Sequence, residues 1–166
     1  MIVIPIFLKT TNELIFNPLK LGIKSIYLEL ESQEYNACEL LLNDKKALFR
    51  TAKTTPTKTG QFVTLWKRTP ERPIAPFHEN DRIDLVFIHC ETVSQTGCFI
   101  FPKKVLIEKG IFSTDLKEGK RAFRVYPPWD KTTSKQAQKT QEWQQDYFIE
   151  LKTQNSIPVK LQQLCF

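Results

Sequence analysis

Two short apolar segments, "CELLL" and "ALFR", flank the polar tetrapeptide "NDKK" at residues 43–46. Each segment has the length and composition of a strand. Asn43 and Asp44 belong to the residue types that tolerate the unusual backbone angles of a tight turn. The pattern therefore predicts a β-hairpin over residues 38–50.

A further strand is predicted over residues 61–68, "QFVTLWKR". Side chains alternate between the two faces of a strand. One face of this strand would carry Phe62, Thr64 and Trp66. The other would carry Gln61, Val63, Leu65 and Lys67.

The segment "RIDLVFIHC" at residues 82–90 is almost continuously apolar and predicts a strand that is covered on both faces. "GCFIF" at residues 97–101 is predicted to be its neighbour, since the polar turn "SQTG" separates the two. "KRAFRVY" alternates as a half-exposed strand does, and Pro127 and Pro128 end it.

Two helices are predicted in the second half of the chain. The first begins near Pro102 and ends at Gly110, because Pro suits a first helical turn and Gly a position just beyond the last. The second lies within residues 133–151, where Ser134 or Thr133 can cap it. Its apolar stripe has helical spacing and comprises Ala137, Thr140, Gln144, Tyr147 and Leu151, flanked by Trp143 and Phe148.

The chain ends are less regular. Residues 1–28 predict a short helix followed by a strand. Residues 152–166 predict one more helical turn that docks through Leu161, Leu164 and Phe166. Together these elements predict one α/β or α+β domain over residues 1–166, with a mixed central sheet of five or six strands and flanking helices.

Positive charge is concentrated in two segments. The net charge is +6, whereas residues 45–72 alone contain eight basic residues and one acidic residue. Residues 101–140 contain ten basic and four acidic residues. Such segregation creates a local potential that attracts polyanions, although a solvated basic surface is the alternative.

The four cysteines have no Cys-x-x-Cys spacing and no matched histidine pair, so we expect no zinc site and no other cofactor. Their apolar surroundings favour buried free thiols in a reducing cytoplasm. The apolar start "MIVIPIFL" lacks a basic region and is too short to span a bilayer, so a membrane partner is not expected.

The loop "AKTTPTKTGQF" at residues 52–62 contains no acidic side chain. A phosphate-binding Walker loop needs several glycines followed by Gly-Lys-Ser/Thr, whereas this loop has only Gly60, followed by Gln61. Its threonine hydroxyls, with Lys53 and Lys58, are suited to contacts with a nucleic-acid backbone. A solvated polar turn is the alternative.

Basic and aromatic residues also alternate between residues 121 and 131. Arg124 follows Arg121, and Tyr126, Trp129 and Lys131 come next. This composition suits stacking on bases together with neutralisation of phosphates. The alternative is that the two aromatic residues belong to the core.

A second hypothesis is a nuclease that uses Mg²⁺, held by an Asp and an (Asp/Glu)-x-Lys motif on neighbouring strands. Asp84 and Lys103 match part of that pattern, but Phe101 stands where the metal-binding carboxylate is required. Glu31 or Glu34 would have to supply the missing acid. The catalytic residues would then be Glu34, Asp84 and Lys103 in a nuclease-like core that lacks its usual acid.

Three segments, "RTAKTTPTKTGQFVTLWKR", "FIFPKKVLIEKGI" and "GKRAFRVYPPWDKTTSKQAQKTQEWQQDYF", resemble the MepB family over about residues 30–152. These bacterial proteins are named from an operon that also encodes a multidrug efflux pump and its repressor. The resemblance implies a cytoplasmic α/β protein and assigns no reaction. The matching positions are Lys53, Thr55, Thr57, Lys58, Gln61, Trp66, Lys67, Arg124, Tyr126, Trp129, Asp130, Lys135 and Gln138.

The leading hypothesis from the sequence is a non-enzymatic domain that binds DNA or RNA. Phosphates would be neutralised by Arg50, Lys53, Lys58, Lys67 and Arg124. The alternatives are the metal-dependent nuclease and a small-molecule-binding accessory protein linked to multidrug resistance.

Overall fold

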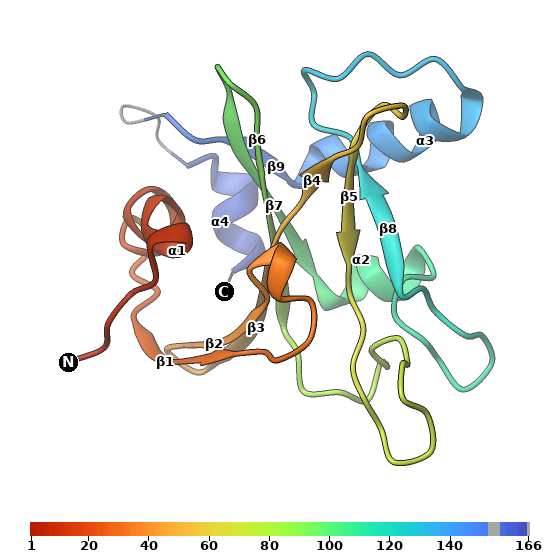
Figure 1. The fold of residues 1–166 in the computed structure, drawn as a ribbon. Coiled ribbons are helices and arrows are strands. Elements are labelled where there is room, and N and C mark those ends of the chain that lie inside the picture. The colour runs from red at the N-terminus through yellow and green to blue at the C-terminus, as the bar shows by residue number, and fades with distance from the viewer. Residues whose placement is uncertain (153–156, 166) are drawn as a thin grey trace.

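Two β-sheets that pack face to face organise the chain, as the computed structural model shows (Figure 1). The structure describes residues 1–152 and 157–165. The larger sheet has the order β1-β2-β3-β6-β7-β9. Its strands are β1 (Ile23–Leu28), β2 (Cys38–Leu42), β3 (Lys45–Thr51), β6 (Leu85–Glu91), β7 (Thr96–Pro102) and β9 (Phe148–Glu150).

The larger sheet is mixed because β3 and β6 run parallel, whereas its other neighbouring pairs are antiparallel. The predicted hairpin is confirmed as β2 and β3, in which Leu42 pairs with Lys45. Asn43 at the turn has a φ of 54°. Its side chain also accepts a hydrogen bond from the Gly22 amide and donates one to the Lys20 carbonyl, which ties the turn to the start of β1.

The predicted pair of buried strands is confirmed as β6 and β7. Leu85 and Phe87 face one core, and Val86 and Ile88 face a second core on the opposite side of the sheet. A strand buried on both faces needs apolar residues at successive positions, which explains the unbroken run in the sequence.

The first core lies under α1 (Ile6–Thr11), the π-helical turn η1 (Asn12–Phe16) and α4 (Val159–Leu164). The predicted N-terminal helix and strand are therefore present. In the tail, Leu161 is buried and Leu164 packs against the core, so the docking of this segment is confirmed for them. Phe166 lies outside the described residues.

The second core is closed by a smaller sheet of β4 (Lys53–Thr54), β5 (Gln61–Thr64) and β8 (Ala122–Val125). The alternation predicted from residue 61 is confirmed, because Val63 and Leu65 are buried. The strand itself ends at Thr64, and it pairs with β4 and β8 rather than with the central sheet. A local pattern indicates which side of a strand is buried but not which strand lies beside it.

The short predicted helix is α2 (Lys103–Glu108), and Gly110 beyond it has a φ of +69°. The long predicted helix is α3 (Lys135–Gln144), where the Ser134 hydroxyl accepts a hydrogen bond from the Ala137 amide. This helix ends earlier than the stripe predicts.

A 3₁₀ turn, η3 (Gln145–Tyr147), follows α3 and leads into β9, and another, η2 (Gln33–Tyr35), joins β1 to β2. Phe148 pairs with Phe99 of β7 instead of continuing the helix. Sheet pairing has overridden the helical spacing. None of the helices in the described ranges is long and apolar enough to cross a membrane.

Candidate nucleic-acid interface

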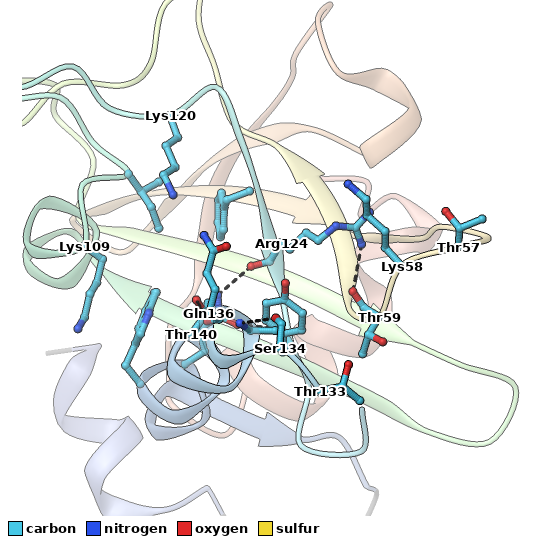
Figure 2. Close-up of a pocket in the computed structure, with 16 residues that line it drawn as sticks. Thr57, Lys58, Thr59, Lys109, Lys120, Arg124, Thr133, Ser134, Gln136 and Thr140 are labelled. Carbon is cyan, nitrogen blue, oxygen red and sulfur yellow. Dashed lines mark hydrogen bonds between the residues drawn. The ribbon is translucent and has the colours of Figure 1, made fainter. Parts of the chain in front are cut away.

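A groove of about 640 Å³ runs between α3, β8 and the loop that joins β4 to β5 (Figure 2). Its lining comes from four separate parts of the chain, which only the fold brings together. The lining residues are Thr57, Lys58, Thr59, Lys109, Ile111, Lys120, Phe123, Arg124, Tyr126, Thr133, Ser134, Gln136, Ala137, Thr140, Trp143 and Gln144.

The groove is positively charged. Its lining includes Lys58, Lys109, Lys120 and Arg124 and no acidic residue. In Figure 2, Lys109 and Lys120 lie toward one end, Lys58 toward the other, and Arg124 between them. None of the four makes an ion pair with a carboxylate in the part of the chain that the structure describes. Their charges therefore add to one potential, which a concave surface concentrates.

Arg124 organises the threonine-rich loop. One terminal nitrogen donates to the carbonyl oxygens of Thr59 and Gly60, at 3.3 and 3.4 Å, and the other donates to the Thr55 hydroxyl at 2.8 Å. The guanidinium also lies 5.8 Å from the centre of the Phe62 ring. All of these partners are neutral, so the arginine is held in place while its positive charge stays uncompensated.

The backbone of the same loop requires glycine at position 60. Its φ is +84°, which glycine adopts at no steric cost. A Cβ at this position would lie 2.6 Å from two carbon atoms of the Tyr126 ring. Gly60 therefore lies directly against that ring, and a larger residue would have to displace it.

Glutamines of α3 hold the other wall. Gln144 is fully buried, and its side-chain amide bridges β8 by accepting from the Tyr126 amide and donating to the Arg124 carbonyl. One turn earlier, Gln141 donates to the carbonyls of Pro127 and Asp130, at 3.0 and 2.8 Å. These bonds satisfy backbone groups that no strand partner reaches.

Four of the predicted binding residues line the groove: Thr57, Lys58, Arg124 and Tyr126. Three more are not among the lining residues. Thr55 bonds to Arg124, Lys53 is exposed 4.9 Å from the centre of the Tyr35 ring, and Lys135 is exposed in the first turn of α3.

Arg50 requires a correction. The sequence suggested a surface residue for contact with phosphate, but its side chain is completely buried on β3. It forms an ion pair with Glu29 at 2.5 Å and donates to the carbonyl of Thr64. Burial raises the pKa of Glu29, and the neighbouring arginine opposes that shift. Arg50 thus links β3 to Glu29, just beyond β1, and to the end of β5, and cannot reach a ligand.

Three other predicted residues also lie outside the groove. Lys67 is paired with Asp81 at 2.7 Å. Gln61 is buried and donates to the carbonyl of Glu91. Trp129 packs edge-on against Phe148, in agreement with the core alternative for this aromatic residue.

Sequence reasoning missed Lys109, Lys120 and Trp143 as parts of this surface. The charge excess of residues 101–140 indicated a basic segment, but it could not show which of the ten basic residues share one surface. Only the approach of α2 and the 113–121 loop to α3 places these two lysines in the groove.

The three residues of the nuclease hypothesis do not meet. Asp84 and Lys103 line a second pocket of about 560 Å³, but the Asp84 carboxylate accepts a hydrogen bond from the Lys46 amide, as a capping residue does. Lys46 lies at the beginning of β3, whereas Glu34 precedes Cys38, which pairs near the end of β3. The expected trio is therefore split between opposite ends of the hairpin.

The described residues contain no group of three or more His, Cys, Asp or Glu side chains that could hold a metal ion. Phe101, at the position that the nuclease pattern reserves for an acid, is buried against Trp143 and Tyr147.

All four cysteines are buried free thiols, as the sequence predicted. Burial raises the pKa of Cys38 to about 12 and that of Cys165 to about 11, and it also raises the pKa of Cys90 and Cys98. Because the thiolate is the nucleophile, such thiols are inert.

The fold is that of a mixed α+β domain. The chain belongs to the MepB-like family, whose model matches residues 29–150. The crystal structure of MepB is similar, with 36% identity, 81% of this chain and 89% of that chain covered, and a TM-score of 0.76.

A bacterial homing endonuclease is a weaker structural match, with 15% identity, coverage of 81% of this chain and 85% of that chain, and a TM-score of 0.42. No curated protein matches the chain. The family match and the MepB structure confirm the resemblance to the MepB family that the sequence indicated, with nearly the same boundaries.

Proposed function

We propose that this protein binds nucleic acid in the groove between α3, β8 and the β4–β5 loop. One observation carries the proposal: four basic residues, Lys58, Lys109, Lys120 and Arg124, line one concave surface that has no acidic residue in its lining. A polyanion releases its counterions when such a surface neutralises it, and this release drives association.

Hydroxyl and amide groups around the four cations support the same proposal. Thr57, Thr59, Thr133, Ser134 and Gln136 line the groove and offer donors to phosphate oxygens. A site for an uncharged drug-like molecule would be lined mainly by apolar and aromatic side chains, so the small-molecule alternative is less well supported.

Fluorescence anisotropy of labelled oligonucleotides at several salt concentrations tests the proposal. The wild-type protein should lose affinity steeply with salt, by roughly 0.7–0.9 log units of K per log unit of salt for each phosphate neutralised. The double variant Lys58→Glu/Lys120→Glu should weaken binding. It should also reduce the salt slope by about the amount expected for the loss of two phosphate contacts.

The matched control is Lys9→Glu/Lys24→Glu. Both lysines are exposed, on α1 and β1, and these elements lie on the opposite side of the molecule from α3 (Figure 1). This variant has the same net charge as the groove variant. Equal binding by the two variants would show that total charge, and not the groove, attracts nucleic acid.

The same samples, incubated with Mg²⁺ and run on a denaturing gel, test the nuclease alternative. Intact oligonucleotide is expected. Cleavage that Asp84→Ala abolishes would replace the binding proposal with an enzymatic one.

A further inference from the structure

The groove contains three aromatic rings, and their surroundings differ. Phe123 is buried in the second core. Trp143 packs against Phe101, with ring centres 5.6 Å apart, and the Lys109 ammonium lies 5.4 Å from the centre of its ring. Two of the three rings thus already pack against other side chains of the protein.

Tyr126 is the remaining ring. It lines the groove and is half-buried, and no described aromatic ring or cation lies against it. One side of the ring rests against Gly60, where a Cβ would come within 2.6 Å. Its hydroxyl makes no hydrogen bond to a described residue.

The position of Tyr126 is fixed at the backbone. It directly follows β8, in which Val125 pairs with Gln61, and its amide donates to Gln144. Arg124, two residues earlier, holds the carbonyl of Gly60 and hence the loop that supports the ring. Because the ring is held in place, Tyr126 loses little conformational freedom when a flat group stacks on it.

We infer that Tyr126 is a stacking platform for one unpaired nucleobase of the ligand and that Gly60 is the residue that positions its ring. The inference rests on the proposed function and deepens it, because it assigns the base contact to one side chain while Lys58, Lys120 and Arg124 contact phosphates. Stacking on an aromatic ring tolerates any base, since each base has a π face.

This assignment is tested by measuring how the intact protein binds three labelled probes. They are a single-stranded oligonucleotide, a single strand of the same length with abasic sites at every position, and the corresponding duplex. Tyr126→Leu should bind the base-containing single strand about 5- to 150-fold more weakly than wild type, the range expected for loss of one stacked base. Its salt slope should stay unchanged, because no phosphate contact is removed.

Three further variants sharpen the test. Tyr126→Phe should bind like wild type, because it keeps the ring. Gly60→Ala should weaken binding as Tyr126→Leu does, because the added Cβ displaces the ring. Tyr27→Leu, at an exposed tyrosine on β1, is the matched control and should have no effect.

Failure of this inference is distinguishable from failure of the proposed function. If wild type binds the abasic strand as tightly as the base-containing strand, with normal salt dependence, the stacking role is wrong and the groove proposal stands. The same conclusion follows if folded Tyr126→Leu loses no affinity. If no probe binds in a salt-dependent way, both proposals are wrong. The wild-type comparison needs no variant, so it decides the question even where Tyr126→Leu fails to fold.

Discussion

Gln144 hydrogen-bonds to the backbone of Tyr126, with 2.8 Å between its Oε1 and the amide nitrogen. The same side chain donates to the carbonyl of Arg124 at 3.0 Å, so a single amide takes the place of a neighbouring strand. Gln144 is fully buried.

Gln144→Ala should therefore reduce the free energy of unfolding by roughly 1–3 kcal/mol, since it leaves the half-buried Tyr126 amide and Arg124 carbonyl without this partner. Urea denaturation measures the change. Gln145→Ala, at the exposed next position, is the control and should change stability by no more than about 0.5 kcal/mol. Similar losses in both variants would contradict the assignment of the effect to the hydrogen bonds of Gln144.

Arg50→Met should destabilise the protein by about 3–5 kcal/mol, because it leaves the Glu29 carboxylate buried without its partner. Arg50→Met/Glu29→Met should recover part of this loss, since no unpaired charge remains. Chemical denaturation of the two variants and wild type gives both values. At a temperature where Arg50→Met stays folded, its salt slope for nucleic acid should equal that of wild type, because the buried guanidinium contacts no phosphate. A reduced slope would return Arg50 to the interface.

Stability should fall on mild acidification through His89. Burial lowers the pKa of this imidazole in the folded protein, and nearby Glu91 opposes the shift only in part. Below the unfolded pKa of about 6.5, the unfolded chain binds a proton that the folded chain does not, so stability decreases as pH falls toward the folded pKa. His89→Asn should flatten the dependence below about pH 7, as measured by urea denaturation at each pH. His78→Asn is the matched control, and an equal flattening there would contradict the assignment to His89.

The native thiols should be unreactive toward a disulfide reagent at pH 8. The pKa of Cys38 is raised to about 12 and that of Cys165 to about 11, and both side chains are buried. Labelling should require unfolding, after which four thiols should titrate. Fast reaction of even one cysteine in the native protein would mean that its surroundings open readily.

Local features were predictable because short-range chemistry determines them. The Asn43 turn, the Ser134 cap and the Gly110 terminus each depend on a residue's own backbone preference or on a partner within one helical turn. The doubly buried strand β6 could be recognised because a side chain that faces a core must be apolar on whichever side the core lies.

Features that depend on distant partners were not predictable. Arginine is a residue type that binds phosphate, which made Arg50 a candidate ligand. In the fold, however, Arg50 is paired with Glu29, 21 positions earlier in the chain. Residues beyond Gln144 continue at helical spacing in the sequence, but Phe148 pairs with β7 and this segment forms a strand instead of a helix. Such outcomes depend on free energies of long-range contacts that no local pattern contains.

The sequence by itself determined a mixed α/β or α+β domain, most strand and helix positions, the membership of the MepB-like family and the segregation of positive charge. Tertiary structure decided which basic residues share a surface: it buried Arg50, paired Lys67 with Asp81, and brought Lys58, Lys109 and Lys120 to one groove. Charge is a property of the residue, whereas its availability to a ligand depends on neighbours that only the folded chain supplies.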